Sequence, residues 1–152
     1  MFFLLVMVSL SCNNTADHEQ LPPEKKDMAA VELPERRSRH FRGVVSNGMK
    51  GDSISFDVSS DGSKMQNFLF KGYWRCSGRL EQQSNAGPQG SFTISNGKVD
   101  DHISEPPNGG ATAWRYEVKA TIAGAGASGT FRMNINALGC DTYVLKWTAT
   151  AD

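Results

Sequence analysis

The segment that decides the fold is residues 114–135, WRYEVKATIAGAGASGTFRMNI, where two alternating runs flank a glycine-rich stretch. Each run switches between apolar and polar side chains at every residue, which is typical of a half-buried β-strand. The segment therefore predicts an antiparallel hairpin with one face in the core. The inward residues of the two strands are Trp114, Tyr116, Val118, Ala120, Ile122, Phe131, Met133 and Ile135, and the outward ones are Arg115, Glu117, Lys119, Arg132, Asn134 and Asn136.

The glycine-rich turn leaves two registers open. If it centres on Ala125-Gly126, Val118 lies opposite Met133 and Lys119 lies opposite Arg132. That register puts two like charges together, which costs a few tenths of a kcal/mol, so a shifted loop of four residues is the alternative. Both registers keep the same residues inward, because a shift by two preserves the faces.

Other alternating runs lie on both sides of the hairpin. Residues 53–59 alternate and are followed by an Asp-Gly turn, residues 65–76 form a longer run, and an Asn-Gly turn divides residues 92–103. Residues 143–149 give the last strand, with Tyr143 on the inward face, whereas residues 80–90 read as a loop. Seven or eight short strands without a helix predict an all-β fold over residues 40–152, an antiparallel β-sandwich or barrel.

The first twelve residues, MFFLLVMVSLSC, combine an apolar run with a small residue and a cysteine. The run is too short to span a bilayer and suits the core of a signal peptide over residues 1–11. Leu10-Ser11-Cys12 resembles the signal of bacterial lipoproteins. The resemblance implies lipidation of Cys12 and anchoring of an exported protein to a membrane of the cell envelope. The sequence Ser9-Leu10-Ser11 would also suit an ordinary signal peptidase, which would leave a secreted or periplasmic soluble protein.

Residues 12–39 have the composition of a flexible tether. They contain Pro22-Pro23, Pro34 and two charged clusters, and few large apolar side chains. A flexible chain of this length reaches about 28 Å, which would hold a domain clear of a lipid surface.

Cysteine parity indicates a disulfide. The chain has three cysteines, and lipidation of Cys12 in an exported protein would leave Cys76 and Cys140 as a pair. Such a bond closes a long loop and is worth roughly 4 kcal/mol in the chain-entropy model. Two separate buried thiols are the alternative reading.

The layout of residues 41–149 also resembles an uncharacterised type of small domain in exported bacterial proteins. The resemblance implies a β-sandwich and no particular chemistry, because its residues are ones that build a fold. The matching elements are Gly43, Asp61-Gly62, Cys76, Asn96-Gly97, Ala127-Ser128-Gly129, Cys140 and Trp147-Thr148-Ala149.

The sequence contains fragments of familiar catalytic and ligand-binding motifs, and each has a simpler structural explanation. Residues 124–129 match G-x-G-x-x-G, but a strand rather than a helix follows, so a hairpin turn explains the glycines better than a dinucleotide site. His102 beside Asp100 and Asp101 reads as a solvated strand edge, and Asp57 and Asp61 supply too few oxygens for Ca²⁺. We expect no catalytic residue, metal or other cofactor.

Function is the least determined property. Sixteen basic and sixteen acidic side chains give zero net charge, so nothing favours nucleic acid as a partner. Tyr73 lies on the face opposite Phe68, Phe70 and Trp74, where it could contact a glycan or a partner protein, or simply cover the end of the fold. The leading hypothesis is a non-enzymatic binding module of unknown oligomeric state. An enzyme inhibitor or sequestering factor comes next, and a small hydrolase third.

Overall fold

The computed structural model describes residues 37–152. The predicted signal peptide, the lipidation site Cys12 and most of the predicted tether lie outside the described residues. The first strand begins at Arg39, one residue before the predicted start of the domain. Within residues 37–152, no helix is long and apolar enough to cross a membrane.

The described chain is all-β, as predicted, with ten strands and one 3₁₀ turn in residues 37–152. The elements are β1 (Arg39–Val45), β2 (Ser53–Val58), β3 (Lys64–Cys76), β4 (Arg79–Ala86), β5 (Phe92–Thr93), β6 (Lys98–Glu105), β7 (Trp114–Ala123), β8 (Gly126–Ile135), η1 (Asn136–Leu138), β9 (Cys140–Asp141) and β10 (Leu145–Ala151).

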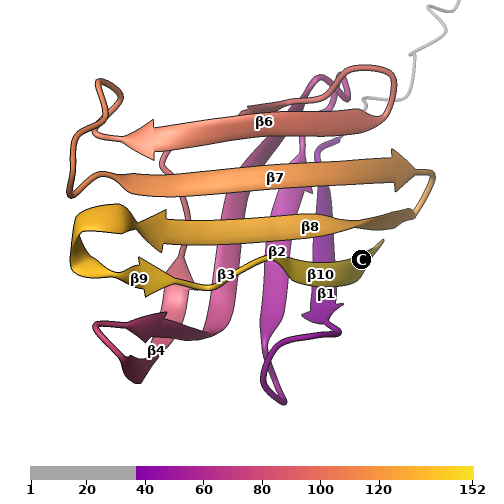
Figure 1. Ribbon diagram of the computed structural model, residues 1–152. Helices are drawn as coiled ribbons and strands as arrows, with labels where there is room; N and C mark the ends of the chain where they lie inside the picture. The colour runs from indigo at the N-terminus through magenta and orange to yellow at the C-terminus, as the bar shows by residue number, and fades with distance from the viewer. Residues whose placement is uncertain (1–36) are drawn as a thin grey trace, which may run out of the picture. The chain divides into compact units, whose positions relative to one another are not determined.

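Six of the strands close into an antiparallel barrel. The order is β10-β1-β2-β3-β9-β8, and β8 pairs again with β10 to complete the ring. Two strands, β4 and β5, add to β3, while β7 and β6 extend the sheet beyond β8. Figure 1 shows β6, β7 and β8 running crosswise to β1, β2 and β3, so the core lies between these two groups of strands.

Aromatic side chains fill the space between the two groups of strands. Phe68 of β3 contacts Phe131 of β8 with ring centroids 4.9 Å apart, and Phe41 stacks on Phe56 at the same separation. The indole of Trp147 meets the Phe56 ring edge-on. Burying each large ring removes 150–250 Å² of surface from water, so this cluster is a main source of stability.

A β-bulge in β3 changes which residues of the strand face the core on either side of Asn67. Asn67 adopts a positive φ of 53°, and the pairing with β2 shifts by one residue between Ser55 and Asp57. Met65 and Phe68 are both fully buried as a result, although strict alternation would put them on opposite faces.

The β7–β8 hairpin differs from both of the registers that the sequence left open. Gly124-Ala125 makes a two-residue turn, Ala123 pairs with Gly126, and Val118 lies opposite Phe131. The prediction that Lys119 faces Arg132 is therefore wrong, and Arg132 lies opposite Glu117 instead. The positive φ of Gly124, 57°, suits this tight turn, and the register joins opposite rather than like charges.

The faces of the hairpin were predicted well, with one exception. Tyr116, Val118, Phe131 and Ile135 are buried. Asn134, predicted outward, is also buried, since it sits in the sheet between Arg115 of β7 and Asp141 of β9.

Two predictions about the edges of the fold are wrong. The supposed loop at residues 80–90 contains β4, which pairs along β3 from Cys76 to Phe70. Tyr143, predicted to face inward in the last strand, precedes β10 and is 61% exposed.

The predicted disulfide between Cys76 and Cys140 is present, with the α-carbons 3.8 Å apart. It joins the end of β3 to β9, where the two residues pair directly. A disulfide is compatible with an exported protein, because such bonds persist in oxidising compartments.

Candidate functional site

A hollow of about 250 Å³ opens at the end of the barrel where the β1–β2 loop, the β3–β4 hairpin and the β9–β10 connection come together. Segments far apart in the sequence line it: residues 47–52, residues 73–80 and residues 141–145. Hollows near this size accept a side chain or a small group of a ligand rather than a whole cofactor.

Apolar side chains surround the hollow and remain exposed. Met49, Leu80, Tyr143 and Val144 line it with relative exposures of 49%, 48%, 61% and 53%, and we call these four residues the barrel-end patch. Grouped apolar side chains around a concavity on a soluble domain commonly mark an interaction site, whereas single ones need no explanation.

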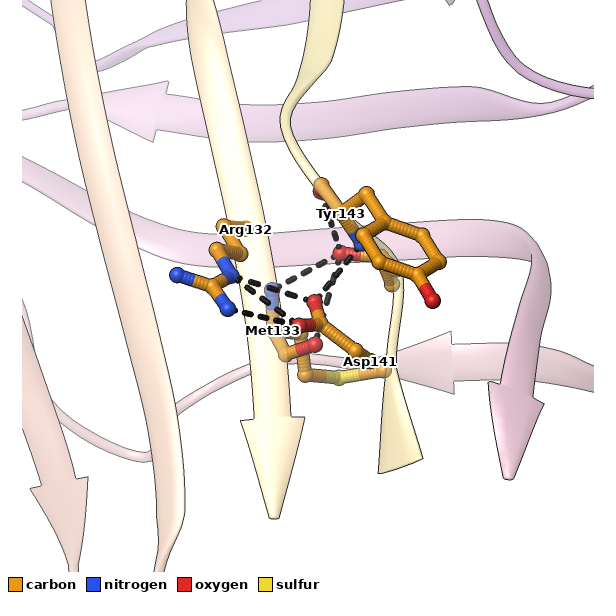
Figure 2. Close-up of polar contacts among 5 residues, drawn as sticks. Arg132, Met133, Asp141 and Tyr143 are labelled. Carbon is orange, nitrogen blue, oxygen red and sulfur yellow. Dashed lines mark hydrogen bonds and ion pairs between the residues drawn. The ribbon is translucent and has the colours of Figure 1, made fainter. Parts of the chain in front are cut away.

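Asp141 fixes the segment that carries Tyr143. Its carboxylate accepts hydrogen bonds from Arg132 Nη2 at 2.6 Å and Nε at 3.1 Å, and from the backbone N–H of Tyr143 at 2.7 Å. The hydrogen bonds from Arg132 and the negative charge of Asp141 hold the pKa of Arg132 above its ordinary value. Figure 2 shows the Asp141 carboxylate between Arg132 and the backbone of Tyr143, with the tyrosine ring projecting away from Arg132.

Thr142 also fixes the segment that carries Tyr143, through hydrogen bonds to the backbone. Its hydroxyl accepts the backbone N–H of Met133 at 2.9 Å and donates to the carbonyl of Tyr143 at 2.9 Å. The backbone φ of Tyr143 is 54°, a left-handed conformation that is rare for a bulky residue. Its neighbours hold the ring outward in spite of that cost, and such strain is concentrated at functional positions in proteins.

Asp52 organises the β1–β2 loop on the other wall of the hollow. One carboxylate oxygen accepts the backbone N–H of Met49 at 2.8 Å, and the side chain is 3% exposed. Gly72 makes room for it, because a Cβ there would lie 2.7 Å from Asp52 Oδ1. Asn47 ties the same loop to the segment before β10, donating to the carbonyl of Val144 at 2.9 Å.

Two polar atoms on the walls of the hollow, Asp52 Oδ1 and Trp74 Nε1, are buried without a hydrogen-bond partner in residues 37–152. Such groups are uncommon in native proteins and each calls for a reason. Both atoms are enclosed by neighbouring atoms of the protein.

Tyr73, which the sequence offered either as a contact residue or as a cover for the end of the fold, lies half-buried on the wall of the hollow. The barrel-end patch itself was missed. Leu80 fell in the supposed loop and Tyr143 in the supposed core. The Asp141-Thr142 pair was the available signal for Tyr143, because Asp side chains often bond the backbone two residues on and begin a turn.

The structure also places the residues tested for chemistry. His102 is exposed on β6, and Asp61 caps the β2–β3 turn through Ser59 and Ser63. His40 Nδ1 lies 2.6 Å from Asp57 Oδ1, a pairing between β1 and β2 that the sequence did not reveal. In residues 37–152 no serine hydroxyl is hydrogen-bonded to His40, and no three His, Cys, Asp or Glu side chains gather as a metal site would need.

Comparisons of the chain with protein-family models, with curated proteins and with solved structures found no match. The resemblances described above to lipoprotein signals and to a domain of exported proteins stay predictions.

Proposed function

We propose that this chain is an exported lipoprotein, anchored to an envelope membrane through Cys12, whose barrel is a non-enzymatic binding module. We propose further that the barrel-end patch receives a partner protein. The observation that carries this proposal is the patch itself, four exposed apolar side chains around a hollow at one end of a rigid barrel.

The chemistry of the patch favours a protein over a glycan. Three of its four members, Met49, Leu80 and Val144, are aliphatic, and aliphatic side chains offer a sugar ring no flat surface on which to stack. Methionine adapts its shape to apolar partners, and tyrosine is enriched among residues that dominate binding energy. The hollow would then take one apolar side chain of the partner.

The two other candidate functions have less support. An inhibitor would present a protruding loop at residues 80–90, but most of that segment is β4, hydrogen-bonded along β3. A hydrolase would need converging Asp, His and Ser side chains. The His40–Asp57 pair supplies two of the three, and it is the specific observation that keeps the hydrolase as a second candidate.

Site-specific photo-crosslinking in cells tests the proposal. A photoreactive amino acid at position 80 of the full-length chain should give one discrete crosslinked protein, and the additional change Tyr143→Asn should abolish it. Asparagine suits this position because it tolerates a positive φ. The matched control places the same group at Val44, an apolar residue outside the hollow that is 63% exposed. Equal crosslinking from both positions would refute a specific partner.

A further inference from the structure

A second hollow, a groove of about 360 Å³, lies on the outer face of β1, β2 and β3. It is separate from the barrel-end hollow and shares no lining residue with it. Two small side chains of the middle strand, Ser53 and Ser55, form its floor, because alternation points them outward beside the buried Ile54.

The walls of the groove carry donors and positive charge. Arg42 stands on β1 opposite Ser55, and Lys71 stands on β3 opposite Ser53, so the two cations flank the two hydroxyls. Asn85 adds a side-chain amide from β4. Among the described residues no carboxylate lines the groove, although the chain as a whole has zero net charge.

Two acidic groups that contact residues of the groove, Asp152 and Asp57, are already engaged. Asp152 lies 3.0 Å from Arg42 Nε, in a pair whose side chains are 72% and 53% exposed. Such a pair is worth little in water, and it leaves the other guanidinium nitrogens available. Asp57 binds His40 and Asn67, and within residues 37–152 Lys71 forms no ion pair.

We propose that this groove binds a small hydroxylated anion, a sugar that carries a carboxylate or a phosphate group. Arg42 and Lys71 hold the anionic group, because a guanidinium matches the geometry of both anions and an ammonium adds a point charge. The hydroxyls of Ser53 and Ser55 and the amide of Asn85 donate to or accept from the sugar hydroxyls. The volume of the groove lies within the range of small-molecule sites.

Titration of the ¹⁵N-labelled full-length chain with four probes tests this inference by NMR. Glucuronate and glucose 6-phosphate represent the two sources of the anion, while glucose and inorganic phosphate each supply half of the ligand. At least one sugar anion should shift the amides of Arg42, Ser53, Ser55 and Lys71 with an affinity about tenfold above both halves. Equal binding of phosphate alone would indicate an adventitious ion only and overturn the inference, as would equal binding of glucose or no shifts in the groove.

Variants separate the site from general effects of charge. Arg42→Ala and Lys71→Ala should each weaken binding of the sugar anion about tenfold, and Ser55→Val, which suits a strand, should weaken it by a similar factor. Lys98→Ala removes a charge outside the groove and should leave the affinity unchanged. If Lys98→Ala weakens binding as much as Lys71→Ala does, the ligand follows overall charge and the proposed site is wrong.

Discussion

Arg132 and Asp141 lie on the neighbouring strands β8 and β9 and form a two-pronged ion pair, with Nη2 2.6 Å from Oδ2 and Nε 3.1 Å from Oδ1. The Asp141 side chain is 19% exposed and that of Arg132 37% exposed, so the pair is partly screened by water. It nevertheless joins the barrel wall to the segment that presents Tyr143.

Asp141→Ala should destabilise the protein by about 1–3 kcal/mol, because it leaves the Arg132 guanidinium and the Tyr143 N–H without their acceptor. The free energy of urea unfolding measures the effect. Asp100→Ala is the matched control, since Asp100 pairs with Lys119 where both side chains are more than 70% exposed. That change should cost less than about 1 kcal/mol. Equal losses in the two variants would show that the Asp141 pair has no special structural role.

Replacement of Cys76 and Cys140 by serine should lower the free energy of unfolding by roughly 2–5 kcal/mol, since the bond closes a loop between residues 64 positions apart. Alkylation of the denatured, unreduced protein followed by mass spectrometry checks the bond itself. Two alkylated thiols at these positions would contradict the disulfide.

The hairpin register can be tested by a double-mutant cycle. Glu117 and Arg132 lie directly opposite each other, so Glu117→Ala and Arg132→Ala should show a coupling energy of about 0.2–1 kcal/mol. A cycle between Lys119 and Arg132, which are diagonal neighbours of like charge in this register, should show a smaller and unfavourable coupling. Phe131→Ala should lower the free energy of unfolding by about 3–5 kcal/mol, because it truncates a core side chain. A change near zero would show that Phe131 does not face the core.

Asp61 predicts a pH dependence at the β2–β3 turn. The hydroxyl of Ser59, together with the N–H and hydroxyl of Ser63, lowers its pKa from the ordinary value of 3.8 to about 2. Since the folded pKa lies below the unfolded one, the stabilisation is present above about pH 4 and is lost as the pH falls towards 2. Wild type should therefore be more stable than Asp61→Asn at pH 5, and the difference should shrink at pH 2. A difference that does not change with pH would contradict the lowered pKa.

Lipidation of Cys12 gives the prediction that decides the anchor. Cells that express the full chain should incorporate a fatty-acid analogue into the wild-type protein and not into Cys12→Ala. A mature protein with an unmodified thiol at Cys12 would refute the anchor and leave the barrel as a secreted or periplasmic domain.

The sequence predicts those parts of the fold in which side chains alternate cleanly. The inward faces of β2, β7 and β8 follow from this alternation, and the disulfide follows from cysteine parity. In contrast, β4 reads RLEQQSNA and carries no apolar period, because it is an exposed strand with no inward face to mark. The bulge at Asn67 could not be predicted from the sequence either, because it depends on one backbone angle rather than on residue type.

The candidate sites were less predictable than the fold. The alternation of the sequence places Tyr73 on the face opposite the core, but the hollow that Tyr73 lines is assembled from three segments whose proximity follows from barrel closure. The groove on the outer face of β1, β2 and β3 likewise depends on how the strands pair. Arg42, Ser55 and Lys71 come together only when β1, β2 and β3 pair in this register, and a single sequence does not contain the register.

One consequence of the two-residue strand β9 concerns the order of assembly. Strand β9 contributes only two residues, Cys140 and Asp141, to the pairing between β3 and β8, so this is a short seam of the ring. We expect closure of the ring and oxidation of the thiols to occur together and late. Pulsed alkylation during oxidative refolding tests this, and a fully paired β8–β9–β3 seam in the dithiol form would disprove it. In a chain that stays reduced, no covalent bond would hold β9 to β3. Completion of the barrel would then depend on the redox state of the surroundings.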